Sequence, residues 1–177
     1  KLIGGGVGIP PMIYLAEHIK GQAISSQPIV LMGSEVPFPF QTRPSQIMST
    51  QFPPEVLACM PLLEDWKVLS RLATNQGYSG CFNGFVTDLA RYTLNLNRSS
   101  LDEFEIFACG PNPMLKAVKA LADEFSLPCQ ISLEEHMACA VGGCAGCAVE
   151  IQEGQNIAMK RVCVDGPIFE AETVIFP

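Results

Sequence analysis

Four of the eight cysteines in this chain of 177 residues follow a spacing that can hold iron. Cys139, Cys144 and Cys147 form a C-x4-C-x2-C run, and Cys163 follows after a gap of fifteen residues. This spacing is typical of plant-type [2Fe-2S] clusters, in which four thiolates hold two irons. Glycines and alanines separate the first three cysteines, so a tight loop can turn its backbone N–H groups toward the cluster. We therefore predict these four cysteines as the ligands of a [2Fe-2S] cluster.

Other interpretations of the cysteines remain open at this point. Structural zinc sites usually combine two short cysteine pairs, whereas this chain combines a triplet with a single distant cysteine. A zinc site would make the chain a non-enzymatic scaffold. A disulfide framework is typical of small secreted domains rather than of a chain with 48% hydrophobic residues. We expect Cys59, Cys81 and Cys129 to be buried free thiols, and the cysteine content as a whole to indicate a reducing, cytoplasmic location.

The stretch that precedes the cysteines alternates between strands and helices. Lys1–Ile3, a fragment of an apolar strand, leads into a glycine-rich turn, and 12–20 has the periodicity of a helix. A strand, a glycine-rich turn and a helix in this order direct backbone N–H groups toward phosphate, although a plain tight connection is the alternative. Further apolar strands are expected at 28–32, 67–73, 103–109 and 128–133. Further helices are expected at 85–96 and 113–125, and another at 55–63 that is interrupted at Pro61. Asn83 is a candidate N-cap of the helix at 85–96.

This alternation predicts an α/β fold with a parallel sheet over residues 1–134, followed by a small β-rich module at 135–177. Ligands of such sheets bind outside the carboxyl ends of the strands. Both the turn at 4–11 and the turn Cys109–Pro111 lie at such ends. We therefore expect a nucleotide-binding domain and a separate [2Fe-2S] domain.

Composition excludes several other classes of protein. The net charge is −7 and only 16% of the residues are charged, without a basic run that could follow a nucleic-acid backbone. The apolar opening of the chain is interrupted by glycines and by Pro10 and Pro11, so it is neither a membrane span nor a signal peptide. We expect no nucleic-acid partner and no membrane span.

The chain resembles the electron-transfer subunits of dihydroorotate dehydrogenase, within the ferredoxin–NADP reductase superfamily. The matching stretches run in family order: Leu2–Pro11, Gly84–Asp88, Cys109–Leu115, Ser132–Cys139 and Val162–Phe169. A related subunit, from NADH-dependent ferredoxin:NADP oxidoreductases, carries Asp at the position of Cys139. Four cysteines at the site therefore favour the dihydroorotate system.

The resemblance implies an iron–sulfur flavoprotein with three parts, of which this chain would contain the last two. FAD would be held mainly by a β-barrel that precedes Lys1, so the chain by itself is expected to be inactive. The resemblance also implies NAD as a cofactor, a hetero-oligomer with an FMN-containing catalytic subunit of dihydroorotate dehydrogenase, and a role in pyrimidine biosynthesis. The alternative is the reductase component of another NAD(P)-linked iron–sulfur flavoprotein.

The same resemblance implies residues near the nucleotide, and it implies no catalytic side chain. The nucleotide contacts that we predict are Gly5, Gly6, Val7, Gly8, Cys109, Gly110, Pro111 and Met114. Among them, Gly6 and Gly8 would face the pyrophosphate, and Cys109–Pro111 would lie near the nicotinamide. In the loop before Gly77 the family has an acidic residue, whereas this chain has Asn75 and Gln76.

Overall fold

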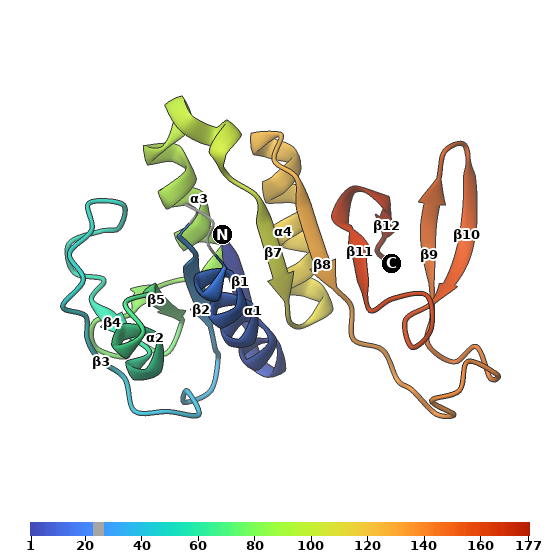
Figure 1. The fold of residues 1–177 in the computed structure, drawn as a ribbon, viewed down its shortest axis with the longest axis horizontal. Helices are drawn as coiled ribbons and strands as arrows, with labels where there is room; N and C mark the ends of the chain where they lie inside the picture. The colour runs from blue at the N-terminus through green and yellow to red at the C-terminus, as the bar shows by residue number, and fades with distance from the viewer. Residues whose placement is uncertain (23–26) are drawn as a thin grey trace.

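Seven strands form one sheet, six of them from the first part of the chain and one, β11, from its end (Figure 1). The structure is a computed structural model that describes residues 1–22 and 27–177. In spatial order the strands are β11 (Ile168–Glu170), β8 (Cys129–Ser132), β7 (Ile106–Cys109), β1 (Leu2–Gly5), β2 (Ile29–Gly33), β5 (Leu69–Thr74) and β6 (Phe82–Asn83). All neighbours pair in parallel except β11, which is antiparallel to β8. The predicted α/β class with a parallel sheet is confirmed.

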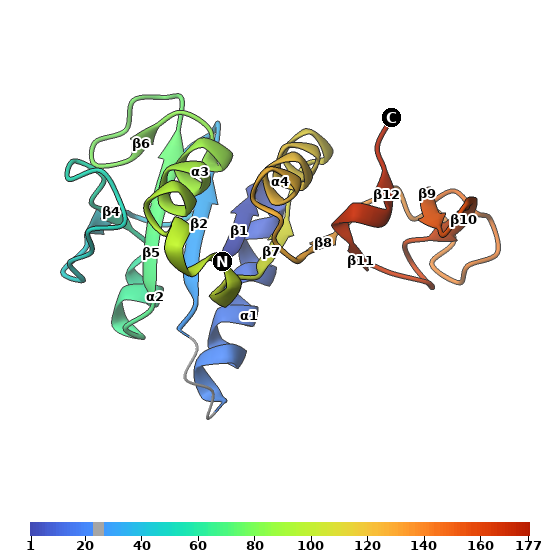
Figure 2. The same cartoon turned by 90° about the horizontal axis from the view of Figure 1, so that it is seen from above.

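The central strands are apolar on both faces because helices cover both faces of the sheet. All four residues of β1 are buried, and so are the first four residues of β2. Continuous apolar runs of this kind are typical of buried parallel strands. On one face lie α3 (Val86–Leu96) and α4 (Asn112–Phe125), and on the other lie α1 (Ile9–Gly21) and α2 (Pro61–Asp65) (Figure 2). Each helix pair closes its own hydrophobic core.

Helix α4 shows how the sequence pattern sets the packing. Its apolar residues recur every three or four positions and are buried at Leu115, Val118, Leu121, Ala122 and Phe125. This spacing places them on one face of a helix. Leu115 and Leu121 are fully buried, and each such side chain contributes roughly 1.5–3 kcal/mol to stability.

The end of the chain forms a smaller antiparallel sheet (Figure 1, right). It consists of β10 (Asn156–Arg161), β9 (Ala148–Glu153) and β12 (Val174–Ile175). The strand β11 and the short 3-10 helix η3 (Ala171–Thr173) connect this sheet to the large one. Lys119 of α4 donates to the carbonyls of Glu172 and Val174, so α4 also holds the tail of the chain.

The remaining elements are short. They are η1 (Gly6–Gly8), β3 (Arg43–Pro44), β4 (Ala58–Cys59) and η2 (Arg98–Glu103). No helix within the described ranges is long and apolar enough to cross a membrane.

Two local predictions are wrong. A helix at 55–63 does not form; α2 begins at Pro61, because proline is favourable at the start of a helix, where its missing N–H needs no partner. Asn83 lies in β6 and does not cap α3. The N-cap position of α3 is Phe85, whose N–H donates to the carboxylate of Asp88 at 3.4 Å.

Candidate functional site

The four predicted cluster cysteines lie in one module, and two of them form a close pair. Cys147 Sγ lies 3.2 Å from Cys163 Sγ, and the Cys144 side chain is among the groups that lower the pKa of Cys139. Two thiolates on one tetrahedral metal ion would be roughly 3.7 Å apart, given metal–sulfur bonds of about 2.3 Å. The separation within the Cys147–Cys163 pair is thus close to that of two ligands of one metal ion.

Backbone N–H groups act on Cys139 and Cys144. The backbone N–H groups of Val141, Cys144 and Gly143 lower the pKa of the Cys139 thiol to about 6. The sulfur of Cys144 accepts the N–H of Gly146 at 3.4 Å. Since metals bind the thiolate form, this loop favours the form that a metal needs.

The thiols of Cys147 and Cys163 shift each other's pKa. Hydrogen bonds from the backbone and side chain of Cys163 lower the pKa of Cys147, and the contact with Cys147 raises the pKa of Cys163. Cys147 is also buried, and its carbonyl accepts the N–H of Val162 at 3.0 Å. This bond ties the two segments that carry the pair, although they are separated by the β9–β10 hairpin.

Arg161 and Asp165 organise the module around the cysteines. The Arg161 guanidinium donates to the carbonyl of Gly142 at 2.9 Å, and the Asp165 carboxylate accepts the N–H of Arg161 at 2.8 Å. These bonds join the cysteine loop to the turn that follows Cys163. Neither residue was predicted from the sequence, because a turn residue and a strand-end arginine carry no motif of their own. The strand β10 ends at Arg161, so Val162 and Cys163 lie in the turn that follows it.

The residues fit a two-iron cluster better than a single metal ion. Two irons bound by four cysteines take two thiolates each, and Cys147 and Cys163 lie together as such a pair in the structure. A structural zinc ion instead needs four ligands around one centre. Within residues 1–22 and 27–177, no group of three or more His, Cys, Asp or Glu side chains is arranged to hold one metal ion. The ligand assignment itself stays a prediction.

A cleft of about 510 Å³ lies at the carboxyl ends of the parallel strands. It is bounded by the turn after β1, the ends of β2 and β5, and the starts of α3 and α4. The described residues that line it are Gly5, Gly6, Gly33–Val36, Ala73–Asn75, Gly84–Thr87, Pro111, Pro113, Met114 and Ala117. Its volume is in the range of small-molecule and cofactor sites. Two helices also begin at it, and helix N-termini attract anions.

The eight predicted nucleotide contacts divide into two groups. Gly5, Gly6, Pro111 and Met114 line the cleft. The other four, Val7, Gly8, Cys109 and Gly110, lie outside the lining. Gly8 is buried, and a Cβ atom there would overlap the carbonyl group of Cys109. Gly8 thus brings two βα turns together by close packing, and whether any of the eight contacts a nucleotide stays a prediction.

The start of α1 offers fewer free backbone N–H groups for phosphate binding than we expected from the glycine-rich turn. Pro10 and Pro11 lack N–H groups, and the N–H of Ile9 donates to the carbonyl of Gly6. The starts of α3 and α4 line the cleft instead, through Val86, Thr87 and Pro113. The sequence signal that could have found them is their position directly after β6 and β7, at carboxyl ends of the same sheet.

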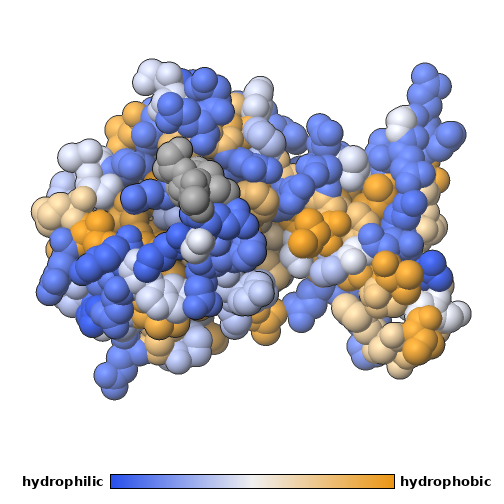
Figure 3. Space-filling view, viewed as in Figure 1, coloured by the Kyte–Doolittle hydropathy of each residue, from blue (hydrophilic) through white to orange (hydrophobic). Residues whose placement is uncertain are grey.

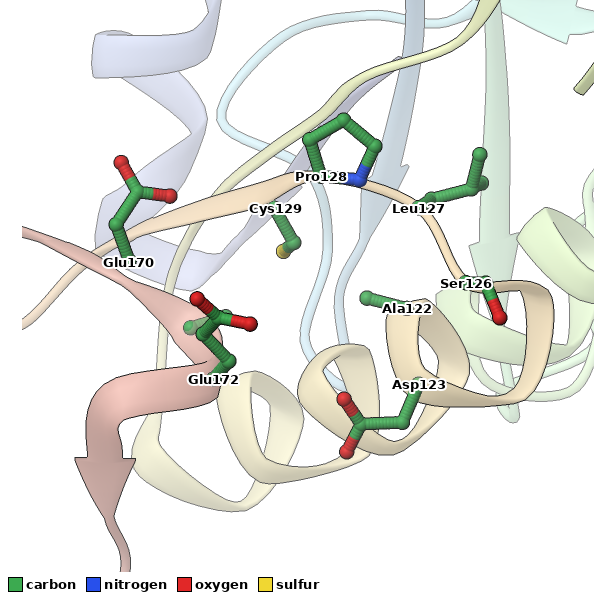
Figure 4. A pocket seen from close by; sticks show the side chains of 9 residues that line it. Ala122, Asp123, Ser126, Leu127, Pro128, Cys129, Glu170 and Glu172 are labelled. Atoms are coloured by element: carbon green, nitrogen blue, oxygen red, sulfur yellow. The ribbon is translucent and has the colours of Figure 1, made fainter. Parts of the chain in front are cut away.

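A second cavity, of about 480 Å³, lies at the opposite edge of the sheet (Figure 4). It is formed by the end of α4, the start of β8 and η3, and Asp123, Glu170 and Glu172 contribute carboxylates to it. Burial raises the pKa of the Cys129 thiol in its wall to about 12, so this thiol stays protonated. A cavity with three carboxylates and an inert thiol is unsuited to the phosphates of a nucleotide.

Comparison with known proteins identifies relatives of the whole chain. Residues 134–175 match the family described as the iron-sulfur cluster binding domain of dihydroorotate dehydrogenase B. The chain is 35% identical over 178 residues to a protein of Caldanaerobacter subterraneus named dihydroorotate dehydrogenase B (NAD(+)), electron transfer subunit. The match covers 99% of this chain and 58% of that protein. The chain is similar to this electron transfer subunit over nearly its whole length.

Further relatives agree with this relationship. A protein of Bacillus caldolyticus with the same name is 33% identical, and an Aquifex aeolicus protein named as a homolog of the subunit is 34% identical. The matches cover 98% of this chain and 56% and 57% of those proteins. The chain therefore spans just over half the length of the curated relatives that it matches. The resemblance noted from the sequence is confirmed.

A solved structure shares the fold. It is described as the NADH-dependent reduced ferredoxin-NADP oxidoreductase, in a study of flavin-based electron bifurcation. The TM-score is 0.63 at 24% identity, and the match covers 98% of this chain and 52% of that one. At this identity the likeness supports the fold.

Proposed function

We propose that this chain is part of an electron-transfer subunit that passes electrons between an FMN-containing dihydroorotate dehydrogenase subunit and NAD, through FAD and a [2Fe-2S] cluster. The observation that carries the proposal is the close pair Cys147–Cys163 in a module that also contains Cys139 and Cys144 and whose sequence matches an iron–sulfur cluster binding domain. A [2Fe-2S] cluster bound there would take up and release single electrons.

Cluster binding and nucleotide binding would be carried out by two different regions of the chain. Residues 135–177 would hold the cluster through Cys139, Cys144, Cys147 and Cys163, and residues 1–134 would bind the nicotinamide nucleotide. All residues that line the cleft fall within 1–134, which supports this division. FAD would be bound mainly by the portion of the subunit outside this chain, since the relatives are considerably longer.

The surface near the cysteines suits a protein partner. Met137, Val141 and Val164 are 46%, 82% and 53% exposed, and they flank Cys139 and Cys163 in the sequence. Apolar side chains gather on this module at the lower right of Figure 3, at the end of the molecule away from the sheet. Exposed apolar patches mark interaction sites, and electron transfer needs the partner close to the cluster. Eight free thiols agree with a cytoplasmic location, which we also propose.

The test uses the intact protein prepared without oxygen, because released thiolates oxidise readily. We expect about two irons and two labile sulfides per chain. With the FMN-containing catalytic subunit added, dihydroorotate should drive reduction of NAD. Stoichiometric zinc in place of iron would contradict the cluster. Electron flow from reduced ferredoxin, and none from dihydroorotate, would favour the alternative reductase.

A further inference from the structure

The cleft at the carboxyl ends of the strands contains one charged side chain. Among the described residues that line it, Glu35 carries the only formal charge, and no Lys, Arg or His is present. The other polar side chains of the lining, Ser34, Thr74, Asn75 and Thr87, are neutral. A cleft with this lining favours groups that donate hydrogen bonds at the position of Glu35 and repels further negative charge there.

The turn that carries Glu35 is fixed by hydrogen bonds on both sides. Ser34 N–H donates to the carbonyl of Ala73 at 3.2 Å, which extends the contact between β2 and β5 past the end of β2. The hydroxyl of Ser34 donates to the carbonyl of Val36 at 2.7 Å and accepts the Val36 N–H at 3.3 Å. Glu35 stands exposed at the tip of this turn. Its carboxylate is thus presented by a defined piece of backbone.

The sheet determines which part of a dinucleotide would lie beside Glu35. Strands β1 and β2 are neighbours, with Gly5 paired to Gly33. A pyrophosphate bound at Gly5, Gly6 and the helix starts would therefore have the end of β2 one strand away, where the ribose of the adenosine follows. A ribose diol donates hydrogen bonds that a carboxylate accepts, whereas a 2′-phosphate brings two negative charges to the same position.

We propose that Glu35 is a specificity-determining residue of this cleft, which accepts the ribose hydroxyls of NAD(H) and excludes nucleotides with a 2′-phosphate. This inference rests on the proposed function, because it assumes that the cleft binds a nicotinamide nucleotide. On this proposal, the residue that distinguishes NAD(H) from nucleotides with a 2′-phosphate lies at the end of β2. Asn75, at the end of β5, is neutral and lines the same cleft, so it cannot repel a phosphate.

The test measures binding of ADP-ribose and of 2′-phospho-ADP-ribose to the intact protein by calorimetry. These probes carry the adenosine half of the nucleotide and need no flavin. The unmodified protein should prefer ADP-ribose by about thirtyfold, the factor for two unit repulsions at about 4 Å in water. In Glu35→Gln the preference should fall by about tenfold or more, mainly through tighter binding of the phosphorylated probe. Salt should weaken the preference of the unmodified protein.

The matched control is Glu17→Gln, which removes an equal charge from the exposed side of α1 outside the cleft. This control should keep the original preference. If both probes bind and Glu35→Gln leaves their ratio unchanged, the role of Glu35 is wrong while the nucleotide site stands. If neither probe binds the unmodified protein, the nucleotide site of the proposed function is wrong, and the inference fails with it.

Discussion

The sheet region and the cysteine-containing residues 135–177 differ in how many hydrophobic residues they bury. In the sheet region, two cores on opposite faces bury long runs of apolar residues from strands and helices. In residues 135–177 only five hydrophobic residues are buried, namely Cys147, Ile151, Val162, Ala171 and Val174, and all five join the core on the α3 and α4 face of the sheet. Small metal-binding modules often obtain part of their folding free energy from the metal. Loss of metal should therefore affect residues 135–177 most, and loss of apolar packing should affect the sheet region most.

Cys147→Ser tests this comparison with the largest expected effect. The cluster should be lost, because one iron would keep a single cysteine ligand. We expect iron content and visible absorption to fall to near zero in protein prepared without oxygen. Amide hydrogen exchange should become fast in β9 and β10 and stay slow in β1 and β7. Cys81→Ser, which changes a cysteine of the sheet region, should keep its iron; full iron in Cys147→Ser would contradict the ligand set.

Gly8→Val tests the packing of the sheet region instead. A side chain at Gly8 would overlap the Cys109 carbonyl and separate the two turns beside the cleft. We expect a loss of about 3 kcal/mol in the free energy of unfolding, as for severe overpacking, and loss of nucleotide binding. The visible spectrum of the cluster should not change. A bleached cluster with normal nucleotide affinity would show that the two regions are not independent.

Glu64→Gln tests how the sheet region anchors the loop that contains Ser45 and Gln46. Burial by itself would raise the pKa of Glu64, but the N–H of Gln46 and the hydroxyl of Ser45, at 2.6 and 2.9 Å, lower it. We expect a loss of about 1–2 kcal/mol, measured by urea unfolding at neutral pH. Because the folded pKa is depressed, this contribution is present above the unfolded pKa and disappears as the pH falls through the folded value.

The control for this prediction is Glu55→Gln, which alters an exposed carboxylate near the same loop. It should change stability very little. If Glu64→Gln were as stable as the unmodified protein across this pH range, the carboxylate would not be the anchor of the loop.

Ala140→Gly should have the smallest effect, and it should be favourable. Ala140 has φ of 54°, in the left-handed region where a Cβ atom is strained and glycine is not. We expect the cluster to be retained and released more slowly to a chelator, with a gain of about 1 kcal/mol. Ala138→Gly, a neighbouring substitution at a residue without positive φ, should give no gain. Faster iron release from Ala140→Gly would show that the loop geometry around the first cysteine is different.

The sequence by itself determined the features that depend on neighbouring residues. The spacing of Cys139, Cys144 and Cys147 requires no knowledge of the fold, since one short loop contains all three. The apolar runs and the helical periodicity of α4 likewise predicted the parallel sheet, because burial acts on each strand and helix separately. Pro61 was harder to interpret, since proline both interrupts a helix and begins one.

The tertiary structure decided what lies between distant segments. It brings Cys163 to Cys147 across a hairpin, joins β11 to the edge of the large sheet, and packs Gly8 on Cys109. It also presents Glu35 in the cleft, where no motif pointed. Such contacts depend on the order of strands in the sheet and on which turns meet at its carboxyl edge. That order is fixed by the packing of the whole domain, because no local pattern of residues encodes which strands become neighbours.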